Sequence, residues 1–143
     1  YWEHNIQQRQ ETKRSVPFKK FDQILKLQSC SFFSLQKEPL KKEEQGSPII
    51  ELHRYMKDFY ATAAMMKHLN LIITADACIV HLAGVLNIPC WLLLSSNADW
   101  RWFFDNENTI WYPNVKIFRQ KDQEDWSSVT SKLYQKLNNL KRD

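Results

Sequence analysis

The chain has 143 residues, of which 43% are hydrophobic and 25% charged, as in one globular domain large enough to bury a core. Its net charge of +4 favours an anionic partner such as a phosphorylated ligand and is too small to indicate a nucleic-acid-binding protein. No apolar run is long enough to span a membrane, and the first residues are too polar for a signal peptide. Cys30, Cys78 and Cys90 form no CxxC pair, so we expect reduced, mostly buried thiols in a cytoplasmic protein.

The N-terminal segment predicts a strand end, a loop and a helix start. Residues 1–2 resemble the tail of a strand whose beginning is missing, so we expect a domain cut from a longer protein. Residues 3–16 are polar and basic, which is typical of a loop. Pro17 suits the first position of a helix, with Ser15 or Val16 as its cap.

Two strands and a helix are expected next. Residues 30–36 form a short apolar run that predicts a buried strand, and residues 37–48 form a charged loop that leads to a second strand at residues 49–52. Asp58 is the expected cap of the following helix. The spacing places three apolar side chains on its inward face, Phe59, Ala63 and Met66.

The middle of the chain predicts a strand, a helix and another strand. Residues 71–75 are apolar throughout, as in a central parallel strand. A helix is expected to begin near Asp76 or Ala77 and to end at Asn87, before a strand at residues 89–94. Its apolar residues recur at helical spacing, namely Ile79, Leu82, Ala83 and Leu86.

The last third combines an aromatic loop at residues 95–114, a strand at residues 115–120 and a helix from about Asp125. The inward stripe of that helix is expected to hold Trp126, Val129, Leu133, Leu137 and Leu140. Strands and helices that alternate in this way predict an α/β domain over residues 1–143, with a mostly parallel sheet covered by helices on both faces.

Ligands of open parallel sheets bind beyond the carboxyl ends of the strands. A helix start near Asp76 would direct free N–H groups to that edge, and the small residues Ala77 and Cys78 would let a phosphate approach the backbone. His81 lies about one turn further and could donate a hydrogen bond. Alternatively, Asp76 is only a helix cap and His81 a partly buried histidine with a satisfied hydrogen bond, and spacing alone favours this alternative.

Two further segments carry candidate binding residues. Arg9, Lys13 and Arg14 precede the first helix, where positive charge opposes the helix dipole and would suit a bound anion, although a solvated basic loop fits as well. Trp100 and Trp102 flank an arginine and would either stack on a sugar or base or cover an edge of the core.

Several chemistries have no matching sequence pattern. With two glycines, the chain holds neither a GxGxxG nor a GxxxxGK[ST] phosphate loop. It has no HExxH, no Cys/His cluster with zinc spacing and no GxSxG elbow. We therefore predict no metal site, and we see no reason to assign a nucleophilic cysteine.

A family resemblance rests on several short segments in order. The segments "HLAG", "P.W.LL", "DWRW", "WYP" and "FRQ", together with "KRSVPF" and "FFSLQKE", resemble the C-terminal domain of glycosyltransferase family 9, the heptosyltransferase-like family. The resemblance covers nearly the whole chain and is greatest to members fused to tetratricopeptide repeats. It implies one Rossmann-like half of a GT-B enzyme, which binds a nucleoside-diphosphate-sugar donor without a metal or other cofactor.

The resemblance also implies roles for particular residues. Four residues would line the donor diphosphate at the helix start, namely Asp76, Ala77, Cys78 and His81. Lys13 or Arg14 would pair with its charge. The family's catalytic base belongs to the N-terminal domain, which this chain lacks, so we expect no catalytic residue here and no turnover by the isolated chain.

Two sites depart from the family pattern. Ala77 stands where the family has Thr or Ser, which removes a hydroxyl contact to phosphate, and Cys78 replaces a small residue. The first loop reads "WEHN", without the glycine that follows the tryptophan in the family. A second hypothesis is therefore a non-catalytic scaffold module of the same fold, attached to tetratricopeptide repeats. A flavodoxin-like regulator fits the α/β pattern but not the tryptophan-rich end.

Overall fold

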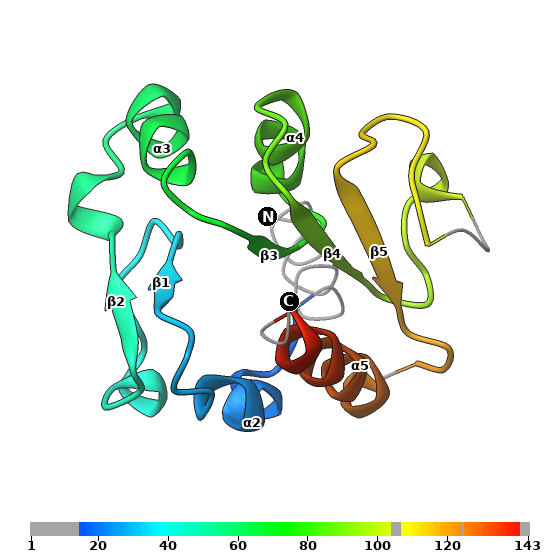
Figure 1. Ribbon diagram of the computed structural model, residues 1–143, viewed down its shortest axis with the longest axis horizontal. Helices are drawn as coiled ribbons and strands as arrows, with labels where there is room; N and C mark the ends of the chain where they lie inside the picture. Colours follow the sequence, from blue (N-terminus) through cyan, green and yellow to red (C-terminus); the bar gives the residue numbers. More distant parts are fainter. Residues whose placement is uncertain (1–14, 104–106, 124, 141–143) are drawn as a thin grey trace, which may run out of the picture.

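The computed structural model describes residues 15–103, 107–123 and 125–140, and their strands pair only in parallel. Figure 1 shows their arrangement. Five strands are present, namely β1 (Phe32–Ser34), β2 (Ile49–Glu51), β3 (Ile72–Ala75), β4 (Cys90–Leu94) and β5 (Val115–Arg119). Short 3-10 turns lie between the helices and strands or ahead of them: η1 (Phe18–Phe21), η2 (Lys42–Glu44), η3 (His53–Tyr55) and η4 (Trp100–Trp102).

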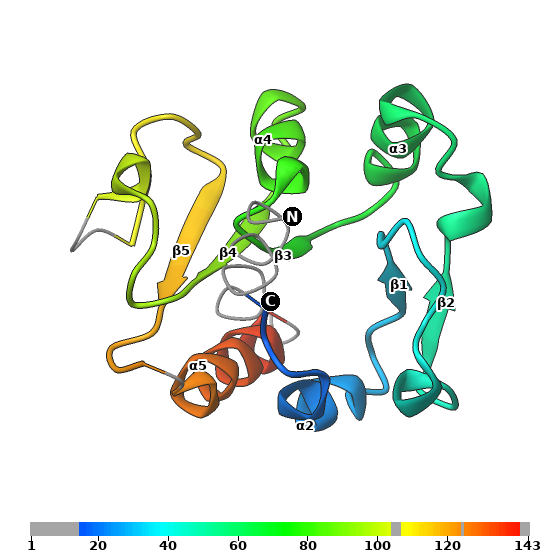
Figure 2. The same cartoon turned by 180° about the vertical axis from the view of Figure 1, so that it is seen from behind.

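The helices lie on both sides of the strands. They are α2 (Asp22–Leu25), α3 (Phe59–Met66), α4 (Cys78–Val85) and α5 (Trp126–Asn139). In Figure 1, α3 and α4 lie above the strands and α2 and α5 below them, and Figure 2 shows the same layers from behind. The α/β class and the parallel strands are as expected from the sequence. No helix among the described residues is long and apolar enough to cross a membrane.

The described strands form two sheets, whereas the sequence predicted one. β1 pairs with β2, and β4 pairs with both β3 and β5. Both views place the strands in the order β2, β1, β3, β4, β5, and β1 does not pair with β3. Among the described residues, no backbone pairing joins the β1–β2 sheet to the sheet of β3, β4 and β5.

β4 separates two hydrophobic cores. Cys90, Leu92 and Leu94 point into the core beneath α3 and α4, whereas Trp91 and Leu93 point into the core beneath α2 and α5. Successive side chains of a strand point to opposite faces, so a strand with a helical layer on each side must be apolar at every position. All five residues of β4 are buried, which makes it the centre of the fold.

The helix starts predicted at Asp58 and near Asp125 are confirmed, and each of these aspartates caps its helix. The Asp58 side chain accepts a hydrogen bond from the N–H of Ala61 at 2.7 Å, and the Asp125 side chain accepts one from the N–H of Ser128 at 3.2 Å. Each bond satisfies one N–H group that the first turn of a helix leaves without a backbone partner. The two aspartates therefore set the starts of α3 and α5.

Three local predictions are wrong. Pro17 is not the first helical residue but the N-cap of η1, because the chain enters α2 through a 3-10 turn. Phe59 is 65% exposed, because α3 is apolar on all sides and buries only Thr62 and Met66. Leu140 is 61% exposed, because α5 ends at the preceding residue.

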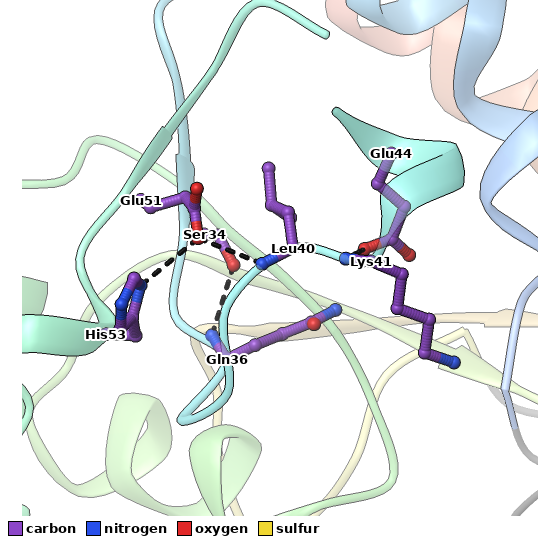
Figure 3. Close-up of polar contacts among 7 residues, drawn as sticks. All are labelled: Ser34, Gln36, Leu40, Lys41, Glu44, Glu51 and His53. Atoms are coloured by element: carbon purple, nitrogen blue, oxygen red, sulfur yellow. Dashed lines mark hydrogen bonds and ion pairs between the residues drawn. The ribbon is translucent and has the colours of Figure 1, made fainter. Parts of the chain in front are cut away.

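Polar contacts hold the loop between β1 and β2 (Figure 3). The Glu51 carboxylate accepts a hydrogen bond from the N–H of Leu40 at 2.9 Å and pairs with Nδ1 of His53 at 3.1 Å. The buried carboxylate of Glu44 accepts one from the N–H of Lys41 at 3.0 Å. Glu51 therefore ties the loop to the end of β2, whereas the Glu44 bond closes a turn within the loop.

Candidate functional site

The start of α4 lies directly beyond the carboxyl end of β3. Ala77 is the N-cap, in an extended conformation, and the helix begins at Cys78. The suggestion that Asp76 caps the helix is therefore wrong. Ala77 has no side-chain group to cap the first N–H groups, and both Ala77 and Cys78 are exposed. This helix start can therefore accept an anion on its backbone.

The loop after β4 brings an arginine to the same edge of the sheet. Asp99 caps η4 by accepting a hydrogen bond from the N–H of Arg101 at 3.1 Å, and its other oxygen accepts one from Nη2 of Arg101 at 2.8 Å. This hydrogen bond with Asp99, supported by the negative charge of Asp76, raises the pKa of Arg101. β3 and β4 pair in parallel, with Ala75 opposite Leu93, so the segments that follow them lie at the same carboxyl edge of the sheet, as predicted.

His81 is enclosed by two aromatic residues. Its Nδ1 lies 3.1 Å from the Tyr112 hydroxyl, and its ring stacks on Trp102 with a centroid distance of 5.6 Å. His81 thus has the partly buried, hydrogen-bonded position that the alternative interpretation predicted. The contact also bears on chemistry: when the Tyr112 hydroxyl donates to Nδ1, Nε2 carries the ring proton and is a hydrogen-bond donor.

Gly84 makes room for this tyrosine. A Cβ atom at Gly84 would overlap the Tyr112 ring, so no larger residue fits without a shift of that ring. His81 and Gly84 are three residues apart and therefore lie on one face of α4. The segments "HLAG" and "WYP" thus belong to one packing unit, in which the glycine admits the ring and the histidine meets its hydroxyl.

Asn114 holds the other end of α4. Its Nδ2 donates to the carbonyl oxygens of Ala83 at 3.0 Å and Ile88 at 2.5 Å. The helix ends in a left-handed residue, Asn87 (φ 55°), and the N–H groups of Asn87 and Ile88 return to the carbonyls of Gly84 and Ala83. This is a Schellman motif, and it confirms Asn87 as the predicted helix end.

The two candidate tryptophans differ in environment. Trp102 is fully buried in the core beneath α4, as in the interpretation that it covers the core. Trp100 is 74% exposed, so its ring is accessible for stacking. The basic residues of the first loop, Lys13 and Arg14, lie outside the described residues.

The three cysteines occupy three different environments. Cys90 is buried, and its burial raises the pKa of the thiol to about 12, so it stays a thiol at neutral pH. Cys30 is half-buried, whereas Cys78 is exposed at the first position of α4, unlike the mostly buried thiols that we expected. Within the described part of the chain, no group of three or more His, Cys, Asp or Glu side chains is placed to hold a metal ion.

Sequence reasoning did not single out Tyr112 and Asn114, although both position α4. Each contacts a helix residue 31 positions earlier in the chain, Tyr112 at His81 and Asn114 at Ala83. The only sequence signal was the recurrence of "HLAG" and "WYP" in order, because no periodicity relates residues so far apart.

Comparison with protein-family models, curated proteins and solved structures finds no match.

Proposed function

We propose that this chain is the donor-binding domain of an inverting, metal-independent glycosyltransferase and takes a nucleoside-diphosphate sugar as its ligand. The observation that carries the proposal is the start of α4, which lies at the carboxyl end of β3 and is capped by Ala77 without a side-chain hydrogen bond. The exposure of Ala77 and Cys78 leaves this backbone open to a phosphate group.

In this proposal the residues act by binding and electrostatics. The N–H groups at the start of α4 would bind the diphosphate, Nε2 of His81 would donate a further hydrogen bond, and Arg101 would offset the negative charge of Asp76. Negative charge that develops on the leaving nucleoside diphosphate is stabilised by such donors. With Ala77 in place of a hydroxyl residue, these contacts would come from the backbone.

The remaining components are also proposals. Lys13 or Arg14 would add positive charge from the first loop. The catalytic base and the acceptor site would belong to the N-terminal domain of a GT-B enzyme, with tetratricopeptide repeats as a further partner. This chain alone would therefore bind the donor in the cytoplasm without turning it over.

The order of the strands supports a Rossmann-like half. One parallel strand between β1 and β3 would complete a six-stranded sheet in the order 3-2-1-4-5-6 of doubly wound dinucleotide-binding folds. The start of α4 would then lie beside the point where the strand order reverses, which is where such folds bind nucleotides.

Titration of the full chain with UDP, GDP and ADP tests the proposal. At least one nucleotide should bind with a Kd below about 1 mM, and His81→Ala should weaken this binding by about 1–3 kcal/mol, the usual cost of losing a charged or buried hydrogen bond. His68→Ala is the matched control, because His68 is an exposed histidine beyond α3. A folded sample that binds none of the three nucleotides contradicts the proposal.

The exposed thiol of Cys78 locates the bound nucleotide. A diphosphate on the start of α4 should slow alkylation of Cys78 and leave Cys30 unaffected, as measured by mass spectrometry. Cys90 serves as an internal reference because it is buried. Binding that leaves the alkylation rate of Cys78 unchanged would place the nucleotide elsewhere.

The exposed aromatic residues around α3 favour a second function, that of a binding or scaffold module. Tyr55, Phe59 and Tyr60 are 66%, 65% and 86% exposed. Large exposed apolar side chains that gather in one region mark interaction surfaces. A folded chain that binds no nucleotide but binds tetratricopeptide repeats would support this alternative.

A further inference from the structure

A pocket lies between the carboxyl end of β5 and α5, away from the start of α4. Its volume is about 830 Å³. No residue of the proposed donor site lines it, and the side chains that matter for its chemistry are Phe118, Gln120, Lys121, Val129, Lys132 and Lys136. The volume lies in the range of sites for small molecules.

The lining of this pocket is strongly basic. Among the described residues, Lys121, Lys132 and Lys136 have no carboxylate partner, and Glu107 is the one acidic residue of the lining. Lys132 and Lys136 lie one turn apart on α5, where like charges repel. Nζ of Lys136 lies 5.0 Å from the centre of the Phe118 ring, so this ammonium group turns toward β5. A bound anion would relieve this repulsion.

A buried amide in the same lining lacks a hydrogen-bond partner. Gln120 is only 3% exposed, and its Nε2 makes no hydrogen bond within the described structure. The backbone N–H of Gln120 donates to the carbonyl of Leu94 at 2.9 Å, which fixes this residue at the end of β5. Buried donors are nearly always paired, and this unpaired amide lies in the lining of a basic pocket, so it becomes available to an acceptor there when the Gln120 side chain turns toward the pocket.

The pocket also has an apolar side. Phe118 and Val129, both buried, contribute to it from β5 and α5. A ligand that matches the whole lining therefore combines an anionic group for the lysines and Gln120 with an apolar or ring-shaped body. A phosphate monoester carries nearly two negative charges at neutral pH, which suits several ammonium groups better than a carboxylate does.

We propose that this pocket binds a small organic phosphate monoester, with the phosphate held by Lys132, Lys136 and the Gln120 amide. Lys121 adds positive charge at the rim. The inference is independent of the donor site, because it depends on β5 and α5 rather than on α4.

Three probes titrated into the full chain by NMR test the proposal, namely phenyl phosphate, phenol and inorganic phosphate. Phenyl phosphate should bind most tightly and shift the amide signals of Gln120 and of residues 132–136. Inorganic phosphate should bind about tenfold or more weakly, because it lacks the ring, and phenol should not bind. Equal affinity for phenyl phosphate and phenol overturns the proposal. Equal affinity for phenyl phosphate and inorganic phosphate shows that the pocket does not recognise an organic body and overturns that part of the proposal.

Matched lysine variants identify the binding residues. Lys132→Gln with Lys136→Gln should weaken phenyl phosphate binding at least tenfold, because charged hydrogen bonds are lost. Lys26→Gln with Lys67→Gln removes the same charge at exposed positions outside the pocket and should have little effect. If both double variants lost the same affinity for phenyl phosphate, the effect would come from net charge alone, and the proposed site would be overturned.

Gln120→Leu separates binding from folding. Leucine keeps much of the volume of glutamine and removes an unpaired buried amide, so the thermal midpoint should stay the same or rise. Affinity for phenyl phosphate should nevertheless fall several-fold, whereas His68→Ala, at an exposed residue outside both proposed sites, should leave that affinity unchanged. Unchanged affinity in Gln120→Leu overturns the role of the amide, and this result says nothing against nucleotide binding at α4.

Discussion

The two-stranded half and the three-stranded half of this protein are built in different ways. We define the two-stranded half as residues 28–65 and the three-stranded half as residues 66–140. Only Glu44 and Thr62 are buried in the two-stranded half. The three-stranded half contains most of both cores, with all of β4 buried between α4 and α5.

The difference shows where the stability of the fold resides. Parallel strands are stable when helices cover both faces, and β3, β4 and β5 meet this condition. β1 and β2 make a two-stranded sheet, which is marginal by itself in water. Leu35 and Phe32 pack against the two cores, but other apolar side chains of this half, such as Ile50 (51% exposed), remain in solvent. This half therefore depends on the rest of the chain or on a partner to cover it.

Leu92→Ala should have the largest effect and tests this division most directly. Leu92 is fully buried in β4, and its truncation should lower the free energy of unfolding by about 2–5 kcal/mol, measured by urea denaturation. Ile50→Ala is the matched variant in β2 and should cost about 0.5 kcal/mol or less. Equal losses in the two variants would mean that both halves contribute alike to stability.

Gly84→Ala should have the next largest effect. The added methyl group meets the Tyr112 ring, and such overpacking should cost about 1–3 kcal/mol in the free energy of unfolding. In a Tyr112→Ala background the cost should disappear, because the overlapping ring is gone.

Gly46→Ala is the control from the two-stranded half. Gly46 has a positive φ of 85° and open space around it. The loss of unfolding free energy in Gly46→Ala therefore comes from backbone strain and should be unaffected by Tyr112→Ala. If Tyr112→Ala changed the stability cost of Gly84→Ala and that of Gly46→Ala by the same amount, the packing explanation would be contradicted.

Asp125→Asn should have the smallest effect and should depend on pH. Hydrogen bonds from Ser128, first from its side chain and then from its backbone N–H, hold the pKa of Asp125 below its ordinary value of 3.8. The charged carboxylate therefore stabilises the folded chain above this ordinary value, and the stabilisation is lost as the pH falls through the lower folded pKa.

The measurement is the difference in unfolding free energy between the wild-type chain and Asp125→Asn as a function of pH. This difference should be constant near neutral pH and should shrink below about pH 4, where the unfolded aspartate takes up its proton. A difference that stays the same down to pH 2 would show that the charge of Asp125 does not stabilise α5.

Strong local patterns predicted much of the fold. The apolar runs at residues 71–75 and 89–94 predicted two strands, and Asp58 and Asp125 predicted two helix starts, because such patterns depend on residues close in sequence. The central strand was expected at residues 71–75, whereas the structure places β4 between β3 and β5 and buries all five of its residues. The inward face of α3 was wrong at Phe59, because a helix that is apolar all round has no periodicity to show which face is buried.

The candidate site was predicted only in part. The sequence placed the segments after β3 and β4 at one edge of a parallel sheet, and the electrostatic effect of Asp76 on Arg101 agrees with this placement. It did not reveal that Tyr112 fills the space above Gly84 and contacts His81, because this contact joins residues far apart in the chain.

The sequence by itself determined the α/β class, the two apolar strands β3 and β4 and the helix that starts beyond β3. These features follow from side-chain periodicity and local hydrogen bonds, which act between residues near each other in the chain. Only the tertiary structure decided that His81 is enclosed by Trp102 and Tyr112, that Cys78 is exposed and that Gln120 is buried without a partner. Burial and pairing depend on which distant segments pack together, and a single sequence does not contain that information in its local pattern.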